Sequence, residues 1–284
     1  METDLAKLLA KKFVQRRDVK SVQTANGKYH PIHEKWKMSD FNEHLAGVST
    51  FGHYLCDQDS KVKLFAFDID LAKTGTWVEW PDLSTLPDDA LRGPDAEDWF
   101  AATTIVHQST PRTDWLDRRH PGREWYKLQL RSMAEVLSSA VRRELDIPVA
   151  TAYSGNKGLH VYGFTGEIDA STARAGALLA METAANTWSE RSEFVKERAH
   201  YLYRNEHRTE PESDWRNLTI EVYPKQDEIS SPEGLGNLMR LPLGKNMKNP
   251  KDPTFFLDQR APHNMLVPHP DPAALLNGKS PWKD

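Results

Sequence analysis

The stretch PVATAYSGNKGLHVYGF, residues 148–164, consists of two short apolar runs separated by a polar turn. The runs at 148–153 and 159–164 are rich in β-branched and aromatic residues, which favour extended strands. The residues between them, Ser-Gly-Asn-Lys-Gly at 154–158, include the Gly and Asn that tight turns require. This stretch therefore predicts a strand, a tight turn and a second strand near the middle of the chain.

Helical patterns lie on both sides of this strand pair. Apolar residues recur every three or four positions from Trp125 to Leu145, which predicts a long amphipathic helix before it. A second helix is expected to begin near Ser171 and to run past Trp188. The N-terminal segment through about Gln15 also has apolar residues at helical spacing and is expected to be a helix.

Three further strands are expected from apolar runs. They lie at 61–70, which contains VKLFAFDID, at 218–223 and at 237–241. The alternation of strands and helices indicates an α/β or α+β fold, with a β-α-β-β-α-β-like half from the centre of the chain onward.

The remaining segments have weak periodicity. Residues from about 71 to 121 are rich in Pro, Asp, Gly and Trp and are expected to form an irregular insertion with one short strand at 104–107. The Pro-rich end, 251–284, is expected to be an extended tail. We therefore expect one catalytic domain over 1–250.

Composition excludes several classes of protein. With 284 residues, 38% of them hydrophobic, the chain is long enough to bury a core. A single cysteine excludes an internal disulfide and a Cys-rich zinc site. The net charge of -4 means that any polyanion site is a local patch. Since neither a long apolar run nor a secretory signal is present, we expect a cytoplasmic protein without a membrane partner.

Two carboxylates stand at the end of one expected strand. Asp68 and Asp70 are two positions apart, so both point to the same face, roughly 6 to 7 Å apart along the strand. Like charges this close repel each other unless a cation lies between them. The alternative is that they cap a turn at a solvated strand end, and an Asp-x-Asp pair also occurs in sugar-nucleotide glycosyltransferases.

The central turn carries a second candidate site. Ser154, Lys157 and His160 surround two glycines whose backbone N–H groups can face an anion, so this turn is a candidate phosphate-binding loop. The alternative is an ordinary β-hairpin turn.

A third carboxylate, Glu221, interrupts the apolar strand Ile-Glu-Val-Tyr and is a candidate metal ligand, or else a solvent-facing position. Arg240 and Lys245 add cations downstream. Three carboxylates with a phosphate-binding turn suit nucleotidyl transfer with two Mg²⁺ or Mn²⁺ ions.

The order of these motifs resembles the archaeo-eukaryotic primase superfamily. The residues that carry the resemblance are Asp68-Ile69-Asp70, then Ser154 to Val161, then Glu221. The segments 44–54 and 221–244 look closer to the primase-polymerases of phages, plasmids and defence systems, so the likeness spans roughly residues 16–245. The third acidic residue is more often Asp in that family, and here it is Glu.

The resemblance implies a two-module core, an N-terminal α/β module and an RRM-like module with the active site between them. It implies that Asp68, Asp70 and Glu221 bind metal. It further implies nucleotide contacts, and the residues concerned are Ser154, Lys157, His160, Arg240, Lys245 and, in the 50–54 stretch, Tyr54.

We therefore expect a DNA-dependent primase-polymerase that makes or extends primers on single-stranded DNA from NTPs or dNTPs, and that works with a replicative helicase on the same or a separate chain. One alternative is a gap-filling polymerase like that of end-joining ligases. Another is a non-catalytic module that binds single-stranded or origin DNA during replication.

Overall fold

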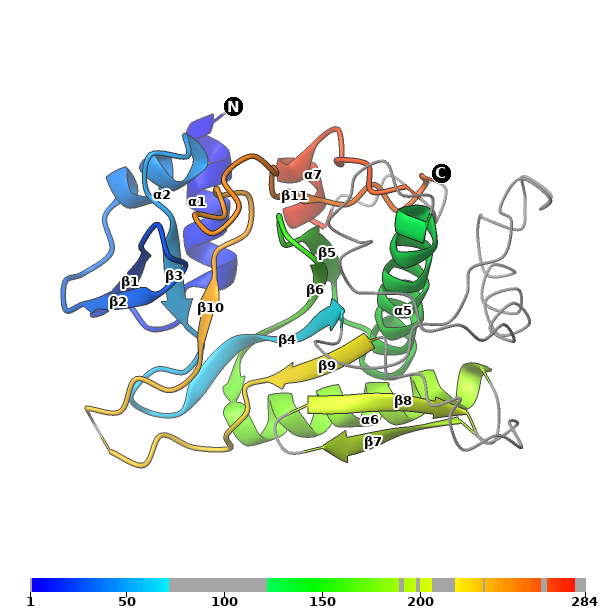
Figure 1. The fold of residues 1–284 in the computed structure, drawn as a ribbon. Coiled ribbons are helices and arrows are strands. Elements are labelled where there is room, and N and C mark those ends of the chain that lie inside the picture. The colour runs from blue at the N-terminus through cyan, green and yellow to red at the C-terminus, as the bar shows by residue number, and fades with distance from the viewer. Residues whose placement is uncertain are drawn as a thin grey trace.

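The computed structural model describes residues 2–71, 122–188, 192–197, 200–205, 218–231, 233–261 and 265–278. The fold is α+β, with helices packed on antiparallel sheets (Figure 1). The helices are α1 (Glu2–Phe13), α2 (Met38–Leu45), α5 (Gly122–Leu145), α6 (Ala170–Trp188) and α7 (Pro272–Leu276). The strands are β1 (Lys20–Gln23), β2 (Tyr29–Ile32), β3 (Phe51–Tyr54), β4 (Lys61–Leu71), β5 (Val149–Tyr153), β6 (Gly158–Asp169), β7 (Ser192–Glu197), β8 (His200–Asn205), β9 (Leu218–Tyr223), β10 (Leu238–Arg240) and β11 (Phe255–Phe256).

The larger sheet has seven strands in the order β11-β5-β6-β4-β9-β8-β7. Its centre is β4, an apolar run that pairs with β6 on one side and with β9 on the other. Because side chains alternate along a strand, Phe67 and Ile69 point to one face and Asp68 and Asp70 to the other. Helices α5 and α6 cover the apolar face, and the face that carries Asp68 is called the pocket face below.

The smaller sheet has four strands in the order β10-β3-β1-β2. Its outer strand β10 comes from far along the chain, and Met239 lies opposite His53 of β3. Figure 1 shows this sheet at the left, beside the pocket face of the larger one. The late strand β10 therefore completes a sheet that is otherwise made of N-terminal strands.

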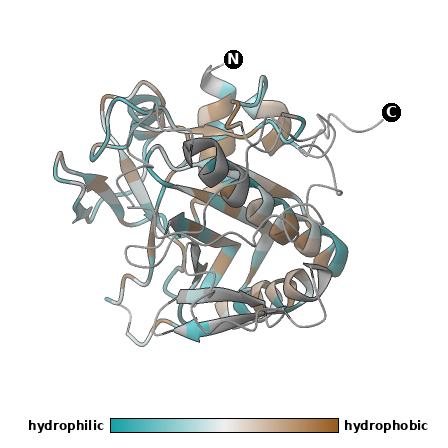
Figure 2. Cartoon of the chain, turned by 45° about the vertical axis from the view of Figure 1, so that its right-hand side comes forward, coloured by the Kyte–Doolittle hydropathy of each residue, from teal (hydrophilic) through white to brown (hydrophobic). Residues whose placement is uncertain are grey.

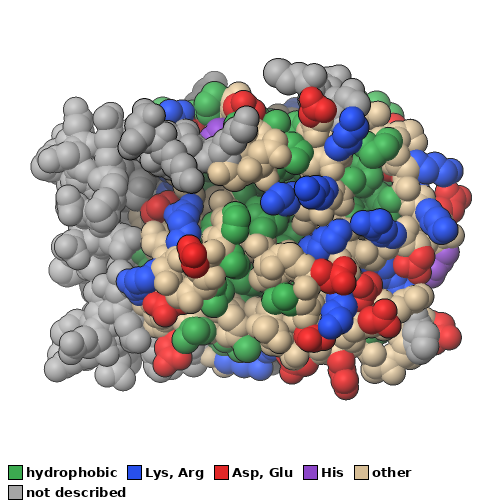
Figure 3. Space-filling model, turned by 180° about the vertical axis from the view of Figure 1, so that it is seen from behind, with side chains coloured by type: hydrophobic (Ala, Val, Ile, Leu, Met, Phe, Trp, Pro, Cys, Tyr) green, Lys and Arg blue, Asp and Glu red, His purple; other side chains and the backbone are tan. Residues whose placement is uncertain are grey.

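The apolar core is continuous through both sheets and the helices. Figure 2 shows hydrophobic residues along the strands of the larger sheet and on the helices packed against it. From behind, Figure 3 shows Lys, Arg, Asp and Glu side chains intermixed on the surface, with hydrophobic side chains between them. Among the described residues, no helix combines the length and the apolar character needed to cross a lipid bilayer.

Most of the expected elements are confirmed. The strands expected at 61–70, 148–153, 159–164 and 218–223 correspond to β4, β5, β6 and β9, and the one at 237–241 corresponds to β10. The three expected helices correspond to α1, α5 and α6. The insertion at 71–121 and its strand at 104–107 lie outside the described residues, except that β4 extends to Leu71.

Helix α6 is described as far as Trp188, and the expected continuation past it lies outside the described residues. A β-hairpin of β7 and β8, which was not predicted, follows and joins the edge of the larger sheet beside β9. The small strands β1 and β2 and helix α2 were also not predicted. Each is short, and β1 and β2 have no clear alternation of apolar and polar residues.

The extended tail expected at 251–284 is wrong for much of its length. Phe255 and Phe256 form β11, which pairs with β5, and Leu257 is buried beside them. Helix α7 begins at Pro272, and the side chain of Asp271 caps it by accepting a hydrogen bond from the Ala274 amide at 2.9 Å. The apolar run Phe-Phe-Leu and the Asp-Pro pair are the signals that point to ordered structure in this segment.

A buried arginine holds this C-terminal segment on α5. The side chain of Arg131 is 3% exposed and donates hydrogen bonds to backbone carbonyl oxygens. These belong to Asp258 (3.2 Å), Met265 (3.2 Å), Gln259 (3.5 Å) and Ala261 (3.2 Å). Because the buried guanidinium supplies donors to these four carbonyls, it ties residues 258–261 and Met265 to α5.

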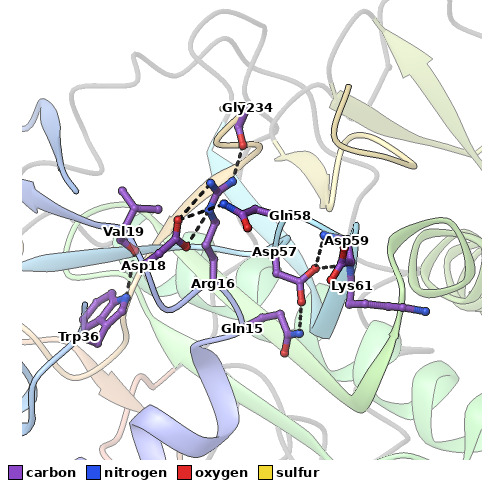
Figure 4. A network of polar contacts seen from close by, with 10 residues as sticks. All are labelled: Gln15, Arg16, Asp18, Val19, Trp36, Asp57, Gln58, Asp59, Lys61 and Gly234. Atoms are coloured by element: carbon purple, nitrogen blue, oxygen red, sulfur yellow. Dashed lines mark hydrogen bonds and ion pairs between the residues drawn. The ribbon is translucent and has the colours of Figure 1, made fainter. Parts of the chain in front are cut away.

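A second polar network fixes the connection between β9 and β10 (Figure 4). The buried guanidinium of Arg16 bonds Asp18, with Nε 3.1 Å from Oδ1, and also donates to the carbonyl of Gly234. Nearby, Gln15 donates to Asp57 at 2.5 Å, and Asp57 accepts from the amide of Lys61 at 2.8 Å. The contact between Arg16 and Gly234 anchors the loop that delivers β10 to the smaller sheet.

Two buried histidines predict acid sensitivity. His44 accepts a hydrogen bond from the Phe51 amide at Nδ1 (3.1 Å), and its Nε2 donates to the carbonyl of Pro242 (3.0 Å), so the neutral ring satisfies both partners. Burial lowers the pKa of His44 to about 4 and that of His53 to about 3. Both histidines therefore stay neutral in the fold at a pH where the unfolded chain takes up protons.

The sign of the effect follows from proton linkage. Below the ordinary histidine pKa of about 6.5, the unfolded chain binds more protons than the native protein, so the free energy of unfolding falls as pH falls. Between pH 7 and pH 5 we expect a loss of about 4 kcal/mol from the two groups together. Urea unfolding at several pH values measures this loss. His53→Gln should reduce by about half the slope of the free energy of unfolding against pH. The exposed control His33→Gln should leave this slope unchanged. A free energy of unfolding that is independent of pH would contradict the prediction.

Candidate functional site

Strand register places the predicted catalytic residues side by side on the pocket face. Asp68 of β4 lies opposite His160 of β6 and opposite Glu221 of β9. Asp70 lies opposite Gly158 and Thr219, one step further along the same face. Residues that are directly opposite in neighbouring strands point to the same face, so a row of ionisable groups crosses the three central strands.

A pocket of about 210 Å³ opens onto this row. Its walls come from both sheets and from the turn between β5 and β6. The lining residues are Gln23, Tyr29, Asp68, Asp70, Ser154, Asn156, His160, Tyr223, Leu238, Met239, Arg240 and Asn246. The pocket therefore lies between the smaller sheet and the pocket face of the larger one.

Asp68 interacts with His160. The imidazole Nε2 is 3.3 Å from Oδ1 of Asp68, and its Nδ1 is 2.9 Å from the hydroxyl of Tyr162. Burial works to raise the pKa of Asp68, but the charge and hydrogen bond of His160 outweigh it, so the pKa lies below its ordinary value. Asp68 is therefore ionised and can attract a cation.

Asp70 lies beside Lys157, with Nζ 2.5 Å from Oδ2. Burial and then the negative charge of Asp68 raise the pKa of Asp70, and Lys157 opposes them only in part. Two carboxylates that share one small space need positive charge, and here the ammonium of Lys157 provides it.

Glu221 has its own partners. Its Oε2 accepts a hydrogen bond from the hydroxyl of Tyr223 at 2.7 Å and lies 2.8 Å from Nζ of Lys225. The same ammonium lies 4.8 Å from the centroid of the Tyr223 ring. Tyr223 lines the pocket, so Glu221 is connected to it through this side chain.

The turn at 154–158 is held by its own hydrogen bonds and by the smaller sheet. The Ser154 hydroxyl accepts from the Gly158 amide at 3.3 Å, and Gly155 has a φ of 70°, which glycine adopts without strain. The Ser154 carbonyl accepts hydrogen bonds from the Arg240 side chain and from Asn246 at 3.3 Å. Arg240 thus reaches from β10 across the pocket to this turn.

Seven of the nine residues predicted for the site lie together in and around the pocket, and two do not. Tyr54 is 5% exposed in β3, opposite Leu238, and is part of the core. Lys245 is exposed to solvent, and its side chain lies near Gly47, outside the pocket lining. Strand β3 is buried along its whole length, and the Tyr54 side chain does not line the pocket.

Sequence reasoning missed several pocket residues from the smaller sheet and its neighbouring loop. They are Gln23, Tyr29 and Asn246. The Tyr29 ring packs over Gly52, where an added Cβ would lie 3.0 Å from Cε1 of Tyr29. Burial raises the pKa of Tyr29 to about 12 although Arg240 opposes the shift, so its hydroxyl stays protonated. The glycine within β3 is the only signal in the sequence for this close approach.

The carboxylates of the pocket provide some of the oxygen ligands that a hard divalent cation requires. Asp68 and Asp70 offer carboxylate oxygens from one face of one strand, and the opposed shifts of their pKa values reflect the crowding of negative charge there. Within the described part of the chain, no group of three or more His, Cys, Asp or Glu side chains is arranged to hold a metal ion. Participation of Glu221 as a third ligand therefore stays a prediction.

Gly158 leaves the space that the Asp70 carboxylate occupies. A Cβ at this position would lie 2.2 Å from Oδ1 of Asp70 and 2.4 Å from the carbonyl oxygen of Ile69. Gly158→Ala should therefore displace Asp70 or separate β4 from β6, with a loss of about 2 kcal/mol in the free energy of unfolding. Urea unfolding measures the loss.

The matched control for this substitution is Gly176→Ala in α6. There an added Cβ would meet only the flexible side chain of Leu145 at 3.3 Å, and alanine is the better helix former. We expect this variant to be as stable as the original protein or more so. Equal stability of Gly158→Ala and Gly176→Ala would contradict the role given to Gly158.

The chain matches no protein-family model, and a search among curated proteins finds no significant match.

Proposed function

We propose that this protein is a template-directed nucleotidyltransferase, a primase-polymerase that joins NTPs or dNTPs to a 3′-hydroxyl on single-stranded DNA. The observation that carries the proposal is the row His160, Asp68 and Glu221 in register on three neighbouring strands, with Asp70 next to it. A binding surface alone does not require paired, half-buried carboxylates, whose repulsion destabilises the fold unless a cation neutralises it.

Asp68 and Asp70 are the residues that would hold a divalent cation, with Glu221 as the third expected ligand. Mg²⁺ or Mn²⁺ bound there would lower the pKa of the attacking hydroxyl and neutralise the charge that develops on the triphosphate. The carboxylates themselves keep the pocket acidic on one side, so an incoming polyphosphate must meet cations from the other side.

Basic side chains around the pocket suit that second role. Arg240 enters from the smaller sheet, and Lys157 and His160 enter from the turn and the strand after it. A guanidinium binds phosphate oxygens in bidentate fashion, while lysine acts as a point charge. Backbone N–H groups of the glycine-containing turn offer further contacts to phosphate. We expect these groups to bind the triphosphate, with the base and template beyond them.

The experiment is nucleotide incorporation on a single-stranded DNA template with Mn²⁺ or Mg²⁺. It is run with and without a primer and with ribo- and deoxynucleotides separately. Labelled product of defined length supports the proposal, and product without a primer identifies a primase. Extension that needs a primer identifies the gap-filling type of polymerase.

An absence of product with either metal and either sugar would overturn the catalytic proposal. Binding of single-stranded DNA under the same conditions, without turnover, would then favour the non-catalytic replication module. Arg240→Gln serves as a second probe, because it removes the charge offered to phosphate and keeps a polar, though shorter, side chain. We expect it to raise the KM for the nucleotide about tenfold or more.

A further inference from the structure

We propose that Tyr162 is a positioning residue that acts on the site through His160. It fixes the orientation of the His160 ring and determines which ring nitrogen carries the proton. The proposal rests on the proposed function for its catalytic consequence, while the geometry at His160 is tested independently of activity. Tyr162 does not line the pocket.

Contact distances define a chain of three side chains on the pocket face. The Tyr162 hydroxyl is 2.9 Å from Nδ1 of His160, and Nε2 of the same ring is 3.3 Å from Oδ1 of Asp68. The three residues lie on adjacent strands, with His160 directly opposite Asp68 and Tyr162 two residues further along β6. Hydrogen bonds at both ring nitrogens leave the imidazole with one orientation.

Packing holds the Tyr162 ring rigidly. The side chain is fully buried, and its neighbours across the sheet are the small residues Ala66 and Ala150, which leave room for the ring. Phe13 of α1 packs edge-on against it at a centroid distance of 5.0 Å, and Phe164 stacks at 6.5 Å. A hydroxyl on a ring fixed in this way stays at one place relative to the pocket.

Hydrogen-bond chemistry determines the form of the neutral His160 ring. Its Nε2 faces a carboxylate oxygen, which only accepts hydrogen bonds, so the ring proton belongs on Nε2. Nδ1 must then accept a hydrogen bond, and the buried Tyr162 hydroxyl is the donor next to it. Without this hydroxyl, Nδ1 would be a buried acceptor without its donor, and the ring could turn or move its proton to Nδ1. Tyr162 therefore keeps the Nε2–H of His160 directed toward Asp68.

The first test is the state of His160 in ¹⁵N-labelled protein, read by NMR at a pH about two units above the ordinary histidine pKa. Signals are assigned by their loss in His160→Asn. In the original protein we expect a single form with the proton on Nε2, and in Tyr162→Phe a mixture with the Nδ1–H form. His44 is the internal control, because its Nδ1 accepts from the Phe51 amide and its signals should not change. Identical His160 signals in both proteins would overturn the proposal.

The second test is a double-mutant cycle on incorporation. Tyr162→Phe keeps the ring and its packing, and we expect it to reduce kcat about tenfold. In a His160→Asn background the same change should have no further effect, because a residue that acts through His160 has nothing left to position. Equal effects of Tyr162→Phe in both backgrounds would show a purely structural role. If the original protein shows no incorporation, the NMR result still decides the role of Tyr162 and only the proposed function fails.

Discussion

Asp68→Asn should reduce nucleotide incorporation at least about a thousandfold while the protein remains folded. The substitution keeps the size and shape of the side chain and removes its charge. Asp68 stands at the centre of the row, opposite both His160 and Glu221, and its carboxylate lies 3.3 Å from Nε2 of His160. The measurement is the rate of labelled product formation, with thermal unfolding recorded on the same preparations.

The control is Asp169→Asn, at the far end of the same pair of strands. Asp169 is also a carboxylate of the larger sheet, but it is exposed and pairs with Lys61 at 2.8 Å. Removing an exposed ion pair costs at most about 1 kcal/mol, and we expect incorporation to be unchanged. Full activity of a folded Asp68→Asn variant would contradict the assignment of the site.

Arg131→Met should have the largest effect on stability, with a loss of about 3 kcal/mol in the free energy of unfolding. Methionine replaces the aliphatic part of the side chain and removes all of its donors. The backbone carbonyls of Asp258, Gln259, Ala261 and Met265 then lose the donors of a guanidinium that is itself buried. Urea unfolding measures the change.

Arg142→Met is the matched control on the same helix. Arg142 also contacts the C-terminal segment, since it donates to the side chain of Gln259 at 3.0 Å, but it is exposed. We expect this variant to lose less than about 1 kcal/mol. A similar loss in the free energy of unfolding of both variants would contradict the prediction that the buried guanidinium of Arg131 holds the C-terminal segment on α5.

The strongest patterns in the sequence predicted the strands at the centre of the larger sheet. The runs that form β4, β5, β6 and β9 are apolar and bounded by turns, so both their type and their approximate ends could be predicted. The period of two along a strand then placed Asp68 and Asp70 on one face, and register brought Glu221 and His160 to the same row. These parts depend on local patterns that tertiary packing supports.

The smaller sheet could not be predicted, because its stability does not come from local patterns. The strands β1 and β2 are short and largely polar. The sheet is completed by β10, which comes from a distant part of the chain. For the same reason Tyr29, Gln23 and Asn246 were missed at the pocket, whereas Tyr54, which was expected there, does not line it. Which side of a strand faces the pocket is determined by a partner sheet that the local sequence does not specify.

Both sheets join strands that are made early in synthesis to strands made late. β3 pairs with β10 through His53 and Met239, and β4 pairs with β9 through Asp68 and Glu221. While the ribosome is still translating the intervening residues, the edge of β3 that pairs with β10 and the edge of β4 that pairs with β9 are open, and open strand edges promote aggregation. Soluble yield should therefore depend on how well chaperones cover the nascent chain until residue 240 has emerged.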